Sequence, residues 1–328
     1  MARFSAVRVA ALAAGLTLAF MGLAQAQTKL QALTKLKVGK SGGPMILTIV
    51  DVGNEAGIWK QYGLEVESIY FGGESQTMVG LASGSIDLGF GSGPGLAYPV
   101  KGVPVTAIAA VSGAPYNMVV LVAANSPIKS LADLRGKKLG VTSAGSLTDW
   151  MAREIGRGQG WGNDGVISFP TGASRTSIAA MRSGDIDGVV MGAATAFDAE
   201  LNKQGRVLAP LGDIVKDFHS NVLFARNELI AQSPDVVQRF VDGWFKAVAF
   251  AKANPEITIK VGAATLRISP ESARAAYEDE ITRMARDRGG FDKDAVEVIR
   301  RSLREIGTLD TPPPAEKLYD ERFVATHK

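Results

Sequence analysis

The chain has 328 residues, 46% of them hydrophobic, with 36 Lys and Arg against 33 Asp and Glu. No run rich in Lys and Arg stands out, so nothing in the charge pattern supports nucleic-acid binding. Cysteine is absent, which excludes a disulfide framework and a lipid-anchoring cysteine.

The first 26 residues have the pattern of a secretory signal peptide. Arg3 and Arg8 precede an apolar run, Val9–Leu23. Ala24-Gln25-Ala26 then forms a small-x-small cleavage site. The run is shorter than the ~20 apolar residues of a typical membrane span. Removing the two arginines leaves 36 − 2 = 34 basic against 33 acidic residues. We therefore expect a free periplasmic protein that is not a lipoprotein and is not inserted in the membrane after cleavage.

Apolar stretches and glycine turns then alternate in the order strand, helix, strand. This alternation predicts a parallel sheet covered by helices. The expected strands are Leu36–Gly39, Val66–Phe71, Ile86–Phe90 and Pro104–Ser112, with helices at Met45–Glu55 and Ser75–Ala82.

A second unit of the same kind follows. Met118–Ala123 is expected to cross into it and Val222–Ala225 to cross back. Its strands are expected at Lys138–Val141, Val166–Phe169 and Ile186–Met191, with helices at Leu147–Gly156 and Arg175–Arg182. The rest reads as helices that pack on the first unit; they begin at Ser233-Pro234, Ser269-Pro270 and Phe291.

One motif recurs at an interval of one hundred residues. Gly72, Ser83, Gly84, Ile86 and Asp87 have counterparts at Gly172, Ser183, Gly184, Ile186 and Asp187, and Val66 and Ser68 at Val166 and Ser168. A repeated α/β unit predicts two similar lobes with a cleft between them. We expect lobe one at 27–115, lobe two at 116–218, and a return to lobe one with C-terminal helices at 219–328.

Five loops follow predicted parallel strands, at 41–43, 72–75, 91–95, 142–146 and 191–195. Ligands of open α/β sheets bind outside those strand ends. Glycine lets a backbone approach a ligand, and helix N-termini attract negative charge. The loops therefore favour a small anion, although each alone could be an ordinary βα turn. Tyr116 and Asn117, at the predicted crossover, are further candidate contacts.

The sequence gives little support to catalysis. His219 is the one histidine away from the C-terminus, and a structural or hinge role suits it better. Ser92 and Ser143 lack the G-x-S-x-G context. With no cysteine and one usable histidine we expect neither a zinc site nor a cofactor, while an all-oxygen calcium site stays open. Trp150 and Trp161 are expected in the core.

Three segments resemble the nitrate/taurine/sulfonate group of substrate-binding proteins of ABC transporters. They are Glu55–Glu67, Ala82–Gly89 with its Ser-Gly-x-Ile-Asp pattern, and Asn125–Lys138. The resemblance implies the type II periplasmic binding protein fold, an α/β fold with two βαβ-rich lobes joined by two crossovers. It also implies a non-enzymatic, monomeric protein that delivers a small molecule to a membrane permease and its ATPase.

The resemblance also implies which loops contact the ligand. Members of the group bind anions such as sulfonates and carboxylates, or pyrimidine vitamin precursors; without an obvious cleft arginine, this chain leaves the choice open. An exported enzyme or sensor with the same fold is the alternative. The candidate contacts are Ser41, Gly42, Gly43, Gly73, Glu74, Ser92, Gly93, Tyr116, Ser143, Gly145, Ser146, Thr171, Ser174, Ala194, Thr195 and Asn221.

Overall fold

The computed structural model describes residues 32–327 apart from 42, 145, 163 and 173. The expected signal peptide, residues 1–26, lies outside the described residues. No helix in the described part has the length and apolar character to cross a membrane.

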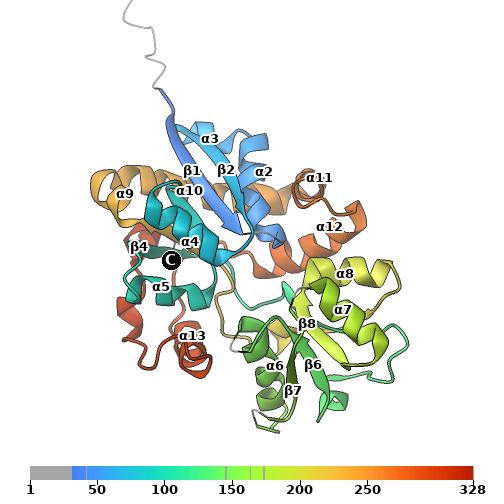
Figure 1. Ribbon diagram of the computed structural model, residues 1–328. Helices are drawn as coiled ribbons and strands as arrows, with labels where there is room; N and C mark the ends of the chain where they lie inside the picture. Colours follow the sequence, from blue (N-terminus) through green and yellow to red (C-terminus); the bar gives the residue numbers. More distant parts are fainter. Residues whose placement is uncertain (1–31, 42, 145, 163, 173, 328) are drawn as a thin grey trace, which may run out of the picture. The chain divides into compact units, whose positions relative to one another are not determined.

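The described residues form two mixed five-stranded sheets (Figure 1). We call the sheet that contains β1, with its helices, lobe one, and the sheet that contains β6, with its helices, lobe two. The first sheet has the order β2-β1-β3-β10-β4, from strands β1 (Thr34–Ser41), β2 (Leu64–Phe71), β3 (Leu88–Gly91), β4 (Val105–Ala110) and β10 (Val222–Arg226). The second has the order β7-β6-β8-β5-β9, from β5 (Met118–Val122), β6 (Lys138–Val141), β7 (Ile167–Pro170), β8 (Gly188–Gly192) and β9 (Arg206–Pro210).

Helices connect and cover these strands. In lobe one they are η1 (Met45–Thr48), α2 (Ile49–Glu55), α3 (Ile58–Gln61), α4 (Glu74–Ser83), η2 (Gly93–Leu96) and α5 (Ala97–Val100). In lobe two they are η3 (Leu131–Leu134), α6 (Leu147–Gly158), α7 (Ser174–Ser183), α8 (Ala193–Leu201) and η4 (Leu211–Asp213). After β10 come α9 (Asn227–Gln232), α10 (Pro234–Ala253), α11 (Pro255–Leu266), α12 (Pro270–Ala276), the π-helix η5 (Tyr277–Met284), α13 (Lys293–Glu305), η6 (Ala315–Lys317) and η7 (Glu321–His327).

The two lobes exchange one strand each. β10 arrives from lobe two and pairs antiparallel with β3 and β4, and β5 arrives from lobe one and pairs antiparallel with β8 and β9. The pairs β1–β2, β1–β3, β6–β7 and β6–β8 are parallel, as predicted. The sheets are thus mixed rather than wholly parallel, because the returning strand fills a position that no βαβ unit supplies.

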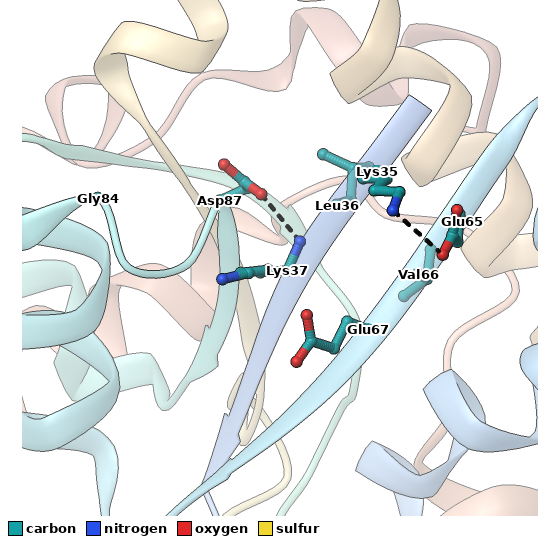
Figure 2. A pocket seen from close by; sticks show the side chains of 8 residues that line it. All are labelled: Lys35, Leu36, Lys37, Glu65, Val66, Glu67, Gly84 and Asp87. Atoms are coloured by element: carbon teal, nitrogen blue, oxygen red, sulfur yellow. Dashed lines mark hydrogen bonds and ion pairs between the residues drawn. The ribbon is translucent and has the colours of Figure 1, made fainter. Parts of the chain in front are cut away.

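The one-hundred-residue repeat is confirmed in the structure. α4 and α7 both end at the serine of the motif, and Gly84 and Gly184 follow with φ of 74° and 85°, the left-handed conformation that glycine adopts without strain. The aspartate then closes the motif. Asp87 Oδ2 accepts a hydrogen bond of 2.8 Å from Lys37 N of β1 (Figure 2), and Asp187 Oδ2 accepts one of 2.8 Å from Lys138 N of β6.

The isoleucine of the motif explains a glycine in each central strand. Ile86 and Ile186 are buried under β1 and β6. A Cβ on Gly39 would lie 2.4 Å from Ile86 Cδ1, and a Cβ on Gly140 would lie 2.7 Å from Ile186 Cδ1. Both contacts are shorter than packed carbon atoms permit, so the two glycines let the helix approach the strand.

The long helix α10 forms where the sequence predicted it. Pro234 occupies its first turn, where the missing N–H costs nothing. Phe240 and Trp244, one turn apart, are fully buried, and Phe240 stacks on Trp59 with ring centroids 4.9 Å apart. α10 packs on α2 and α3 of lobe one, and α11 packs on α2.

Three elements differ from the sequence-based expectation. The helix expected from Met45 begins with the 3₁₀ turn η1 before α2. β9, a partly buried edge strand, was not expected, because its apolar run Val207–Ala209 is short and is followed by Pro210. The later helices pack on both lobes: α12 contacts α8, and α13 contacts both η2 and, through ion pairs, α6.

Asp187→Ala is expected to lower the free energy of unfolding by about 1 kcal/mol, the net value of one hydrogen bond. Asp87→Ala should cost more, because the ion pair of Asp87 with Arg226 at 2.9 Å is closer and less exposed than that of Asp187 with Lys137 at 3.6 Å. The check is thermal unfolding of both variants beside Asp198→Ala, an exposed position on α8. Equal melting temperatures for Asp187→Ala and the control would contradict the assigned role.

Candidate functional site

A cavity of about 150 Å³ lies between the lobes at the carboxyl ends of β1 and β3. Lobe one contributes residues from three loops, lobe two contributes one side of α6, and both crossovers complete the wall. The lining residues are Pro44, Glu74, Gly91, Ser92, Pro115, Asn117, Met118, Leu147, Met151, Phe218, Ser220 and Asn221.

Glu74, the first residue of α4, is hydrogen-bonded to the loop that follows β3. Its Oε1 accepts a hydrogen bond of 2.9 Å from Ser92 N, and its Oε2 accepts one of 2.7 Å from Ser92 Oγ. A Cβ on Gly91 or Gly95 would lie 2.5 Å or 2.1 Å from Glu74 Oε1. The glycines therefore make room for the carboxylate, and burial raises the pKa of Glu74 against the lowering effect of the two hydrogen bonds.

The crossovers, residues 111–117 and 211–221, run side by side and are bonded to each other. Asn221 N donates to Ser112 Oγ at 2.7 Å, and Ser112 Oγ donates to Asn221 Oδ1 at 3.1 Å. Ser220 Oγ donates to Gly113 O at 2.9 Å. This pairing places the polar residues of both crossovers at one edge of the cavity.

His219 has the structural role that the sequence favoured. Its Nε2 accepts from Asp292 N at 3.0 Å, so the ring proton lies on Nδ1, which faces Ser112 O at 3.4 Å. Burial, followed by the charge of Arg286, lowers the pKa of His219 to about 4, although Asp292 acts in the other direction. A neutral, fully buried imidazole between the crossover and α13 fits a hinge better than acid–base chemistry.

The turn after β1 is held by a carboxyl group that the sequence analysis did not single out. Glu280 on the π-helix is 1% exposed, and its Oε2 accepts from Ile46 N at 3.1 Å. Burial raises its pKa to about 8, while the backbone N–H groups of Ile46 and Met45 oppose the rise. The first turn of η1 therefore already has an internal acceptor.

An acceptor in the cavity wall has no partner. Asn117 Oδ1 is buried and makes no hydrogen bond to any described residue, although Asn117 N donates to Met284 Sδ and Asn117 O accepts from Ala193 N. Buried polar atoms are nearly always hydrogen-bonded. Asn117 belongs to the cavity lining, so its unpartnered amide is a candidate for a hydrogen bond to a ligand or to water.

The structure brings four of the sequence-predicted residues to the cavity, namely Glu74, Ser92, Asn117 and Asn221. Others have internal partners. The Tyr116 ring lies 3.6 Å from the Arg283 guanidinium, Ser146 Oγ caps α6 by accepting from Asp149 N, and Thr171 Oγ1 bonds Ser177 Oγ. Six others follow strand ends but lie outside the lining: Gly43, Gly73 and Ser143 on loops, Gly93 at the start of η2, and Ala194 and Thr195 in the first turn of α8.

Four predicted positions have no side-chain account. Gly42 and Gly145 lie outside the described residues, as do the side-chain surroundings of Ser41 and Ser174. Trp150 is buried, as the sequence predicted.

Sequence reasoning missed the apolar part of the wall. Leu147 and Met151 lie one turn apart at the start of α6, and Phe218 lies on the second crossover. An i, i+4 apolar pair directly after a predicted ligand loop was an available signal. Tyr116 and Asn117 were both candidates at the crossover, and only the fold shows that Asn117 is the one that lines the cavity.

A larger hollow, of about 580 Å³, lies at the opposite ends of the strands. Figure 2 shows Lys35 facing Glu65, with Lys37, Glu67 and Asp87 around the hollow. Lys35 Nζ and Glu65 Oε1 are 3.9 Å apart, and both side chains are more than half exposed. Because ligands of α/β sheets bind at the carboxyl ends of strands, we regard the smaller interlobe cavity as the candidate site.

The lining includes one ionisable acid, Glu74, and no basic side chain. In the described residues no group of three or more His, Cys, Asp or Glu is placed to hold a metal ion. The cavity can therefore offer hydroxyl, amide and carboxyl groups beside the apolar side chains of α6.

Comparison with known proteins gives a family and a fold. Residues 47–258 match the family described as NMT1/THI5 like. A candidate binding protein of Brucella abortus is 28% identical over 250 residues, which cover 73% of this chain and 76% of that protein.

Two solved structures frame the fold. The periplasmic aliphatic sulphonate binding protein of Escherichia coli gives a TM-score of 0.73 at 20% identity, covering 88% of this chain and 92% of that one. The desulfurization enzyme DSZB gives a TM-score of 0.65 at 18% identity, covering 90% and 98%, and its cysteine-to-serine mutant was solved with biphenyl-2-sulfinic acid. The chain has the two-lobed type II periplasmic binding protein fold.

Glu280→Gln is expected to flatten the pH dependence of stability. Between the ordinary carboxyl pKa of 4.5 and the folded value of about 8, the folded protein binds the proton more tightly than the unfolded chain does. The free energy of unfolding therefore falls as pH rises through that window. The glutamine variant has no group that titrates there, so it lacks this fall.

The measurement is the melting temperature from pH 5 to pH 8.5 for wild type, Glu280→Gln and the matched control Glu278→Gln, an exposed position on the same π-helix. The wild type minus Glu280→Gln difference should become more negative with rising pH. A difference that does not change with pH, or the same trend in the control, would show that Glu280 titrates normally.

Proposed function

The chain belongs to the NMT1/THI5-like family, and from this premise we propose that it is a periplasmic solute-binding protein of an ABC transporter. It captures one small organic molecule between its lobes and delivers it to a membrane permease driven by an ATPase. We place the lobe boundaries in the crossovers, near residues 115 and 218, and the working form is a monomer.

The observation that carries this proposal is the wall of the interlobe cavity. Asn117 presents a buried, unpartnered acceptor there, and Glu74 and Ser92 add polar groups from lobe one while Leu147 and Met151 add apolar surface from lobe two. A mostly apolar wall with a few fixed polar groups is typical of small-molecule sites. Contributions from both lobes mean that a bound molecule would stabilise their association.

The size of the cavity limits the ligand. At about 150 Å³ it is smaller than the roughly 300–1,000 Å³ of pockets for drug-sized molecules. A ligand enclosed in this conformation is therefore a small one.

For the ligand we propose a small acid, a sulfonate or carboxylate, that also carries a hydrogen-bond donor. The N-terminus of α4 has no side-chain cap, so its first N–H groups can receive an acidic oxygen. Asn117 Oδ1 lacks a donor, and the Glu74 carboxylate, which already accepts two hydrogen bonds from Ser92, can accept another from the ligand. A molecule with both kinds of group, such as an amino-sulfonate, would match both.

A neutral pyrimidine-type ligand is the second candidate. It is favoured by the absence of a basic side chain from the described lining and by the presence of Glu74 and two asparagines. Carboxylate and amide side chains are well suited to the amino groups and ring nitrogens of a heterocycle. A panel of ligands separates this candidate from the small acids.

The enzyme alternative has little support in the site chemistry. The enzyme DSZB shares the fold, and one of its solved forms replaces a cysteine, whereas this chain contains no cysteine. In this chain the two ring nitrogens of the buried His219 face backbone groups, Ser112 O of the first crossover and Asp292 N at the start of α13. No described residue of the lining is an obvious activated nucleophile.

The decisive test is a thermal-shift screen of the mature protein against alkanesulfonates, taurine, aliphatic and aromatic carboxylates, nitrate, bicarbonate and aminopyrimidines. A ligand at ~100 times its dissociation constant adds about 2.7 kcal/mol of stability. That corresponds to a rise of roughly 5–10 °C for a protein of this size. The proposal would be overturned if no compound raised the melting temperature and native mass spectrometry showed no small molecule bound to the purified protein.

Asn117→Ala is expected to weaken binding of the best compound by roughly tenfold to a hundredfold, the value of one to two buried hydrogen bonds. Calorimetric titration measures this, with Asn202→Ala, an exposed asparagine on lobe two, as the matched control. Unchanged affinity in Asn117→Ala would place the ligand elsewhere.

A further inference from the structure

A charged cluster joins α6 of lobe two to α13 at the C-terminal end of the chain. Arg301 Nη2 lies 2.7 Å from Glu154 Oε2, and Arg157 Nη2 lies 2.7 Å from Glu305 Oε1. Arg157 also pairs with Glu154 within α6. Trp150 Nε1 donates to Glu305 Oε2 at 2.9 Å. We call these five residues the α6–α13 cluster.

The cluster is balanced in charge, and one of its carboxylates is shielded from water. Two arginines face two glutamates; the Glu154 side chain is only 8% exposed, whereas Arg301, Arg157 and Glu305 are partly exposed. Burial raises the pKa of Glu154, and Arg301 and then Arg157 act against that rise. A carboxylate in such a place depends on its partners for its charge, because removing one partner of a buried pair leaves an uncompensated charge.

Both helices of the cluster also form the wall or the support of the ligand cavity. Leu147 and Met151, at the start of α6, line it directly. On α13, Ile299 packs against Gly93, next to Ser92, so closely that a Cβ on Gly93 would lie 2.7 Å from Ile299 Cδ1. α13 therefore holds a lobe-one ligand loop while its charged side holds lobe two.

Trp150 links the cluster to the cavity. Its ring stacks on Phe218, with centroids 5.5 Å apart and planes inclined by 22°, and Phe218 lines the cavity. The indole N–H ends on Glu305. The fully buried Trp150 of α6 thus contacts both α13 and the second crossover. These are the elements that must move apart when the lobes separate.

We propose that the α6–α13 cluster is an interlobe latch that holds the cleft in its narrow conformation before any ligand binds. The consequence of the latch rests on the proposed function, because the latch would set the fraction of molecules whose cleft is ready to enclose a ligand. If that fraction falls tenfold, the apparent affinity for the ligand falls about tenfold as well. The cluster would thereby regulate affinity without contacting the ligand.

The absence of cysteine makes a direct test simple. Cysteines introduced at Lys60 on α3 and Arg182 on α7, both exposed, carry two spin labels, one on each lobe. Dipolar spectroscopy then gives the interlobe distance distribution without ligand. The test variant is Arg301→Gln with Glu305→Gln, which removes one charge of each sign and leaves Glu154 paired with Arg157.

The expected result is a shift of the distribution to longer distances in the double variant and in Trp150→Phe, which keeps the stacking but removes the N–H donor. Arg304→Gln, an exposed position on the same helix, should match the starting protein. Circular dichroism and a cooperative melt establish that each variant is folded.

A distribution in the folded double variant that matches Arg304→Gln would overturn the latch. Because the measurement uses no ligand, its outcome is independent of the ligand screen. If the screen fails while the distances shift, the proposed function is wrong and the latch stands. If ligands bind while the distances stay unchanged, the proposed function stands and the latch is wrong.

Discussion

The exchange of one strand between the two sheets is the constraint on which the site depends. Each sheet is completed by an antiparallel strand delivered by the other half of the chain, β10 to lobe one and β5 to lobe two. The chain must therefore pass between the lobes twice, and the two passages lie side by side and bond to each other through Ser112, Gly113, Ser220 and Asn221. Asn117 and Asn221 reach one cavity for this reason, although they are far apart in the sequence.

Three buried glutamates each lie where two parts of the fold meet, and one of them, Glu74, lines the cavity. Glu74 ties α4 to the loop after β3, Glu280 ties the π-helix to the turn after β1, and Glu154 ties α6 to α13. Burial raises the pKa of all three. A buried carboxyl group is costly unless its hydrogen bonds are made, so each contact is sensitive to movement of its two elements.

Much of the fold was predictable because it follows from local and repeated patterns. The Ser-Gly-x-Ile-Asp motif combines a left-handed helix stop, a buried isoleucine and an aspartate that bonds the central strand, and the same combination appears in both lobes. The ligand loops at strand ends follow from the parallel βαβ units. Glu74 and Ser92 could be identified on those loops because they adjoin glycines that allow a close backbone approach.

The sequence by itself determined the α/β class, the repeated α/β unit and the loops at the carboxyl ends of the parallel strands, because these depend on periodicity and turn chemistry over a few residues. Only the tertiary structure decided which residues meet. Glu280 reaches Ile46 across 234 positions, and Arg301 reaches Glu154 across 147. Neither pair carries a local signal, because exposed and buried glutamates look alike on a helix until the packing of distant elements removes one of them from water.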